Sequence, residues 1–155
     1  MSALWEAIVT GSARSGLPAF FPERAYAQVK AIADPAADYR GRLLAEYKLD
    51  IAAAHALLGR GSARAPLLGV RVPAAYAHWV DPGACYNRVG YYEVPNARVV
   101  YRERGTTRSF GIASMISWRG VWYVVHLGAV TRTGGGGVVD DPGPGPGSSA
   151  PSSTC

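Results

Sequence analysis

Residues 108–130 read RSFGIASMISWRGVWYVVHLGAV, and this stretch decides the fold that the sequence predicts. Residues 108–118 and 121–130 each alternate in the manner of a β-strand, and Arg119-Gly120 suits a tight connection between them. Both segments carry apolar residues on both faces, which is typical of central strands covered on each side. We expect helices to cover one face. The cover of the other face is left open by the sequence: a partner subunit, a tight curl of the sheet or a ligand.

Three further strands are expected before this hairpin. Residues 67–79 alternate around a break at Pro73, and residues 86–94 form a strand closed by Pro95-Asn96. Residues 97–104 then lead into a hairpin turn. Together the strands predict an antiparallel meander from about residue 67 to residue 130.

The first 60 residues show helical periodicity instead. Residues 4–10 suffice for one or two turns, and residues 22–33 place apolar side chains on one helical face. The longest apolar stripe runs from residue 36 or 38 to residue 58. Helices followed by antiparallel strands predict an α+β fold, with N-terminal helices packed on one face of a curved β-meander.

The chain length allows one domain with a real core. We expect residues 1–19 to be a lead-in segment and residues 20–132 to form a single α+β domain. Residues 133–155 are rich in Gly, Pro and Ser and are expected to be a disordered tail, because they have little apolar surface to bury.

The composition excludes several classes of function. The net charge is +5, but the arginines are scattered, with one local group at Arg98, Arg102, Arg104 and Arg108. No lysine-rich tract or nucleic-acid-binding motif is present, so nucleic acid is an unlikely partner, and the arginines are interpreted as protection of strand edges. No stretch approaches the roughly 20 apolar residues that span a bilayer, so no transmembrane segment is expected.

The same composition bears on origin. Only Lys30 and Lys48 are lysines, so 14 of the 16 basic residues are arginine. With the abundant Ala, Gly and Pro, this bias is typical of a GC-rich genome such as that of an actinobacterium. Residues 1–16 lack the layout of a signal peptide. Two locations therefore stay open: an extracytoplasmic one reached with a signal that has been removed, and the cytoplasm.

A family resemblance adds to this interpretation. The string WRGVWYVVHL, residues 118–127, resembles the closing hairpin of the NTF2-like (SnoaL-like, cystatin-like) superfamily, in which such a strand lines a conical pocket. The strings FFPERAYAQVKAIADPAADYRGRL and SFGIASMISWRGVWYVVHLG are similar to a group of uncharacterised actinobacterial proteins that are often exported. These resemblances imply an NTF2-like cone and a cell-envelope setting, and they bring no catalytic residues with them.

The histidines are the first candidates for chemistry. His55 on the long helix and His126 on the last strand are placed to face one pocket, and Tyr91, Tyr92 or Asp81 would complete an acid–base pair with His126. The alternative is that each histidine is satisfied by a backbone group. No sequence motif identifies a catalytic set, a metal site or a cofactor site: the metal-binding spacings H-x-x-H, H-E-x-x-H and C-x-x-C are all missing from the sequence.

Cys85 and Cys155 are the two cysteines. In an exported protein they would form a disulfide, which would contribute about 3–5 kcal/mol by closing a long loop. The alternative is one buried thiol and one exposed tail thiol.

The functional expectation that follows is a non-catalytic binding or assembly domain of NTF2-like shape in an actinobacterial cell envelope. Its partner would be a protein, a second copy of the chain meeting one sheet face, or a small apolar ligand. The first alternative is a small-molecule isomerase or hydrolase with a His-based pocket. The second alternative is a structural subunit of a larger complex.

Overall fold

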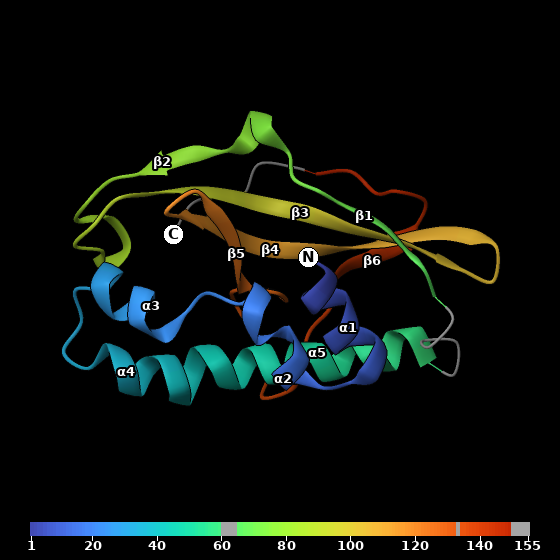
Figure 1. Ribbon diagram of the computed structural model, residues 1–155, viewed down its shortest axis with the longest axis horizontal. Coiled ribbons are helices and arrows are strands. Elements are labelled where there is room, and N and C mark those ends of the chain that lie inside the picture. Colours follow the sequence, from blue (N-terminus) through green and yellow to red (C-terminus); the bar gives the residue numbers. More distant parts are fainter. Residues whose placement is uncertain (60–64, 133, 150–155) are drawn as a thin grey trace.

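Two long antiparallel strands, β3 (Tyr91–Glu103) and β4 (Thr106–Trp118), form the centre of the sheet (Figure 1). The computed structural model describes residues 1–59, 65–132 and 134–149. The β3–β4 turn places Arg104 and Gly105 at φ 48° and 84°, as the two central residues of a tight hairpin turn require. The predicted connection at Arg119-Gly120 is confirmed, with φ values of 51° and 82°.

Shorter strands pair with the outer edges of this hairpin. β1 (Leu67–Arg71) and β2 (His78–Val80) both pair with β3, while β5 (Val121–His126) and β6 (Asp140–Pro144) both pair with β4. All pairs are antiparallel, and the sheet of six strands is not closed. The α+β class is therefore confirmed.

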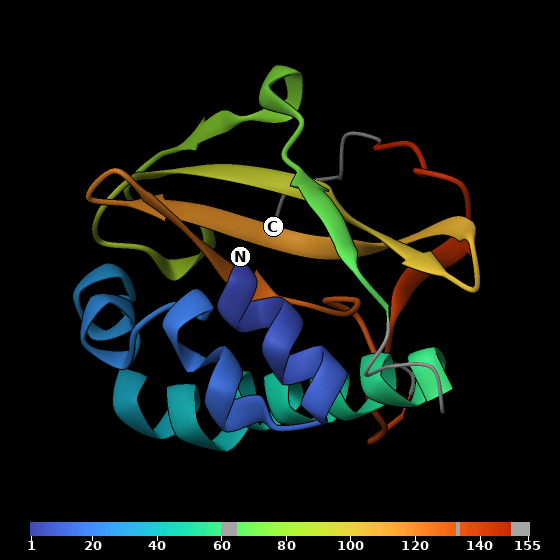
Figure 2. The same cartoon turned by 45° about the vertical axis from the view of Figure 1, so that its right-hand side comes forward.

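Helices cover one face of the sheet, as expected (Figures 1 and 2). Along the chain these are α1 (Ser2–Thr10), α2 (Ala13–Gly16), η1 (Leu17–Ala19), α3 (Glu23–Val29), α4 (Pro35–Asp38), η2 (Tyr39–Leu43) and α5 (Leu44–Leu58). The predicted long helix is thus one helical segment over α4, η2 and α5, whose middle is a π-helical turn. Two short 3₁₀ turns, η4 (Ala74–Tyr76) and η5 (Ala84–Tyr86), connect the early strands.

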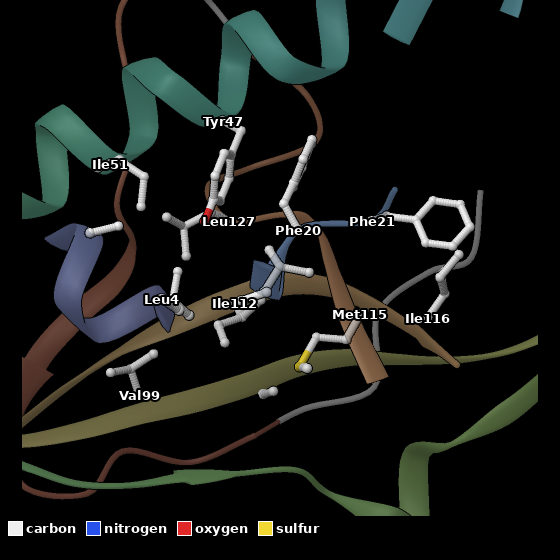
Figure 3. Packing of buried hydrophobic residues seen from close by; sticks show 14 of the residues in the cluster. Leu4, Phe20, Phe21, Tyr47, Ile51, Val99, Ile112, Met115, Ile116 and Leu127 are labelled. Atoms are coloured by element: carbon white, nitrogen blue, oxygen red, sulfur yellow. The ribbon is translucent and has the colours of Figure 1, made fainter. Parts of the chain in front are cut away.

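The core fills the space between the helices and the sheet (Figure 3). Phe20 stacks on Tyr47 of α5, with ring centroids 4.2 Å apart. Leu4, Ala7 and Ile8 of α1 are fully buried in the same cluster. The prediction that residues 1–19 are a lead-in segment is therefore wrong: their 3-4 spacing of apolar residues makes α1 a core helix.

One predicted break does not exist. Residues 91–103 form one strand through Pro95-Asn96, in constant register with β4, where Pro95 lies opposite Ser114 and Ala97 opposite Ile112. Asn96 takes φ 52°, a conformation that asparagine tolerates better than most residues, so the chain passes without losing register.

The position of β5 also differs from the prediction that both strands of the closing hairpin are central. β4 is central, but among the described strands β5 pairs with β4 alone and is therefore an edge strand. Its outer edge meets residues 20–21 instead: Phe20 forms a parallel bridge with Val124, and the Phe21 amide donates to the Val124 carbonyl oxygen at 2.9 Å.

The strand β6 corrects the prediction of a disordered tail over residues 133–155 for the part at 134–149, while residue 133 and residues 150–155 lie outside the described residues. Gly143 pairs with Ser109 and Asp140 with Gly111, at the edge of β4 that β5 leaves free. The prediction counted only apolar burial, whereas polar anchors hold this segment: the Val138 amide donates to Asp50 at 2.9 Å, and Arg98 donates to Asp141 at 2.9 Å. Proline in β6 is tolerated because this is an edge strand.

Candidate functional site

A cavity of about 480 Å³ lies between the helices and the sheet. The residues that line it come from the segment around α3, from η2, from η5, from strands β2 to β6 and from the segment between β5 and β6: Phe21, Tyr26, Val29, Lys30, Arg42, Leu43, His78, Cys85, Tyr91, Glu93, Pro95, Asn96, Ala113, Ser114, Ile116, Val125, His126, Ala129, Val130, Thr131 and Asp140. The volume is in the range of small-molecule sites. The lining combines apolar side chains with several ionisable ones.

The structure brings two of the predicted site residues together. His126 and Tyr91 both line the cavity. His55 does not line it. Its Nδ1 lies 2.9 Å from the Ile8 carbonyl oxygen, so this histidine is satisfied by a backbone group, which was the alternative considered from the sequence. Asp81 is exposed and accepts a hydrogen bond from Trp79 Nε1 at 3.0 Å. The acid–base pair of His126 with Asp81 is therefore not formed.

His126 ends β5, opposite Ser114 of β4. Burial lowers its pKa to about 4, and the positive charges of Arg42 and Arg132 act in the same direction. The imidazole is therefore neutral at pH 7. Its nearest carboxylate oxygen among its ion-pair partners is Oε2 of Glu46, 3.9 Å from Nδ1, which is beyond hydrogen-bond range.

A stripe of charged residues on the long helical segment borders this side of the cavity. Its members, Asp38, Arg42, Glu46 and Asp50, recur every four residues. Arg42 donates to both carboxylate oxygens of Asp38, at 2.8 and 2.7 Å, and its Nη1 lies 3.8 Å from Oε2 of Glu46. Arg42 is therefore a neutralised cation. The four-residue spacing was visible in the sequence and was missed, although it predicts one helical face.

Tyr26 joins this stripe from α3. Its hydroxyl donates to Oδ2 of Asp38 and accepts from Nη2 of Arg42 at 3.1 Å. Burial and the Asp38 hydrogen bond raise the pKa of Tyr26, while Arg42 opposes the shift. Tyr26 therefore stays a neutral hydrogen-bonding group in the cavity wall.

Across the cavity, the sheet contributes a second polar group. Glu93 of β3 accepts from the Ser114 hydroxyl at 2.7 Å, and its Oε2 lies 3.9 Å from Nε2 of His78 on β2. That nitrogen is buried and has no hydrogen-bond partner, while His78 Nδ1 lies 3.1 Å from the Tyr76 carbonyl oxygen. Because a carbonyl can only accept, Nδ1 of His78 carries a hydrogen. Nε2 of His78 and Oε2 of Glu93 face each other at 3.9 Å without a hydrogen bond between them.

Lys30 follows α3 and supplies an ammonium to the cavity. Its Nζ donates to the Cys85 carbonyl oxygen at 2.9 Å. Burial lowers the pKa of Lys30, and the charge of Arg42 lowers it further. Sequence reasoning did not single out Lys30, and only the tertiary contacts show its surroundings.

The described residues offer no cluster of three or more His, Cys, Asp or Glu side chains that could hold a metal ion. Within the same part of the chain, no helix combines the length and apolar character needed to cross a membrane. The predicted bridge of Cys85 stays a prediction, because Cys155 lies outside the described residues.

The face of the sheet opposite the helices has a cover from within the chain. Residues 141–149 pass over it (Figure 2), where Arg98 is bound to Asp141 and to the Ser109 hydroxyl, and Ser149 donates to the Asn96 carbonyl oxygen at 2.7 Å. On the same face, Trp79 and Tyr92 pair across β2 and β3 and are half exposed. Association through this face stays a prediction.

No protein-family model matches the chain, and no curated protein or solved structure proved similar to it. The NTF2-like assignment therefore stays a prediction. The geometry of the cavity is therefore the basis for assigning its function.

Proposed function

We propose that this protein is a non-catalytic binding domain of NTF2-like shape that holds a small molecule in the cavity between its helices and its sheet. The observation that carries the proposal is a cavity of about 480 Å³ with polar groups on two opposite walls. Small-molecule sites are usually concavities of this size in which a few polar groups converge beside apolar surface, and this cavity has both kinds of surface. An actinobacterial cell-envelope setting is part of the proposal and rests on the sequence resemblance alone.

An unpartnered polar atom of the lining supports a ligand over a cavity filled only by the protein. Nε2 of His78, which lines the cavity, is buried without a hydrogen bond. Leaving such a group unsatisfied costs about 1–3 kcal/mol, so a molecule that bonds to it gains affinity. A purely apolar ligand would leave this atom unsatisfied, so the proposal is a ligand that carries a polar group.

The isomerase or hydrolase alternative has one observation in its favour: neutral His126 lines the cavity. It needs a carboxylate that orients the imidazole, and the 3.9 Å separation from Glu46 does not provide a hydrogen bond. Binding is therefore the better supported function. A ligand recovered chemically unchanged after prolonged incubation supports binding, and turnover that His126→Gln abolishes supports the alternative.

The experiment that tests the proposal is a fragment screen by ligand-observed NMR, with binders mapped on the amide spectrum. We expect shift changes at cavity residues such as Ala113 and His126. Val130→Trp places a large side chain at the cavity wall, where Val130 is 59% exposed and tolerant of change, and should abolish binding. The matched control Val121→Trp, 49% exposed and outside the cavity lining, should bind like the unmodified protein.

Two results would overturn the proposal. One is a screen without any binder. The other is a set of binders whose shifts lie on Trp79 and Tyr92 and persist in Val130→Trp, which would move the function to the exposed sheet face.

A further inference from the structure

The backbone on both sides of Lys30 is held firmly against the segment that leads into β3. Lys30 bridges to Asn87, the Arg88 amide donates to the Val29 carbonyl oxygen at 2.7 Å, and the Ala31 amide donates to the Tyr86 carbonyl oxygen at 2.7 Å. The root of the Lys30 side chain is therefore fixed, and its half-buried ammonium is presented to the cavity.

The ammonium has no carboxylate of the described residues at ion-pair distance, although the negative charges of Asp38 and Glu93 act on it from farther away. No carboxylate oxygen of the described residues lies within 4.0 Å of Lys30 Nζ, whose one hydrogen bond goes to the Cys85 carbonyl oxygen. Arg42, the other cation of the cavity wall, differs because Asp38 and Glu46 surround it. An ammonium has three donors, so two of them are free for a ligand.

The apolar wall lies in the same cavity. Val125, Ala129 and Val130 line it and keep accessible surface, whereas Phe21, Leu43 and Ile116 are packed in the core behind. A ligand that satisfies both features has an apolar body and an anionic group.

On the premise that the cavity binds a small molecule as proposed above, we infer that the ligand is a small organic monocarboxylate. Its carboxylate pairs with the ammonium of Lys30, and its apolar body lies against Val125, Ala129 and Val130. A charge-assisted hydrogen bond of this kind is roughly twice as strong as a neutral one.

The remaining charges of the cavity select a monoanion. Glu93 and Asp140 line the same cavity and would repel a second negative group. The Glu93 carboxylate instead favours a hydroxyl or another hydrogen-bond donor on the ligand body. A phosphate dianion needs more cations than Lys30 alone provides.

The test uses the fact that the chain has only two lysines. Labelling with ¹³C-lysine gives one Cε signal for Lys30 and one for the exposed Lys48. The probes are cyclohexanecarboxylate, cyclohexanecarboxamide and cyclohexane-1,4-dicarboxylate, which share one ring and differ in charge. We expect the monocarboxylate to shift the Lys30 signal, to raise the pKa of Lys30 and to leave Lys48 unchanged.

The affinities give a second readout. The monocarboxylate should bind roughly ten-fold or more tightly than the amide, since a hydrogen bond to a charged group is stronger than a neutral one. The dicarboxylate should bind more weakly than the monocarboxylate. Lys30→Gln should remove the preference for the monocarboxylate over the amide, Lys30→Arg should retain it, and the matched control Lys48→Gln should behave like the unmodified protein.

The outcomes separate this inference from the proposed function. Equal binding of the monocarboxylate and the amide in the cavity, or tighter binding of the dicarboxylate, overturns the monocarboxylate and leaves the binding function standing. Failure of the cavity to bind any probe or fragment overturns both. If Lys30→Gln does not fold, the shift of the Lys30 signal in the unmodified protein on addition of the monocarboxylate still tests the inference.

Discussion

Arg132 donates to both carboxylate oxygens of Asp50, at 2.8 and 2.6 Å, across 82 residues of sequence. Asp50 is 1% exposed, and it also accepts from the backbone amides of Gly128 and Val138 at 2.9 Å each. One buried carboxylate on α5 therefore binds the end of the hairpin, the segment after it and the approach to β6.

We predict that Arg132→Met lowers the free energy of unfolding by about 3–5 kcal/mol, because it leaves the Asp50 carboxylate buried without its cation. Urea unfolding followed by circular dichroism measures the change. The matched control is Arg40→Met, which removes an exposed pair with Glu23 and should cost about 0–1 kcal/mol. Equal losses of unfolding free energy in the two variants would show that the buried pair stabilises the fold no more than the exposed pair does.

Truncation after Gly136 tests whether the C-terminal segment is part of the fold. We expect a loss of about 2 kcal/mol, since Asp50 loses the Val138 amide and Arg98 loses Asp141. The truncated chain should also aggregate more readily, because residues 108–111 of β4 become an unpaired edge. Cys155→Ser in the full chain is the control, since it separates the loss of β6 from the loss of any bridge. Unchanged stability on truncation would restore the prediction of a disordered tail.

The stability of the protein should fall below neutral pH because of His126. Its pKa is about 4 in the folded chain, against an ordinary value of 6.5. Between these values the unfolded chain binds a proton that the folded chain does not, so stability is lost as the pH falls from 6.5 to 4. The loss from this residue reaches about 3 kcal/mol.

Urea unfolding of the unmodified protein and of His126→Gln, measured from pH 8 to pH 4, checks this prediction. The difference in unfolding free energy between the two proteins should be constant above pH 7 and should change as the pH falls below 7. Parallel curves over the whole range would contradict it, as would an NMR titration of His126 with a midpoint near 6.5.

Gly111 lies where β6 crosses β4, and a Cβ added there would overlap the carboxylate of Asp140. We predict that Gly111→Ala costs about 1–3 kcal/mol through displacement of β6. Gly69→Ala in β1 is the matched control, because no atom lies within 4 Å of the added Cβ. Hydrogen exchange of the β4–β6 amides should rise in Gly111→Ala alone. If both variants unfold at the same urea concentration, the close packing of β6 on β4 is refuted.

The predicted bridge between Cys85 and Cys155 is open to direct measurement. Intact mass after alkylation, with and without reductant, should show two alkylated thiols only after reduction. Reduction should then lower stability by about 3–5 kcal/mol through the long loop it opens. Alkylation of the unreduced protein at both cysteines would exclude the bridge.

The sequence by itself determined the elements that depend on local pattern. The helical stripe of residues 36–58 and the closing hairpin around Arg119-Gly120 are in place, because apolar periodicity and turn residues act over a few positions. His126 was a pocket candidate from the sequence and lines the cavity together with its neighbour Val125, but its role stays a prediction.

Only the tertiary structure decided what lies next to these elements. Part of the second sheet face is covered by a segment whose composition predicted disorder, and polar contacts from Asp50 and Arg98 hold it there. The place of Lys30 in the cavity wall was likewise not visible in the sequence. Whether a charged side chain is paired depends on groups that are far away in the sequence, and a local sequence pattern gives no information about which groups those are.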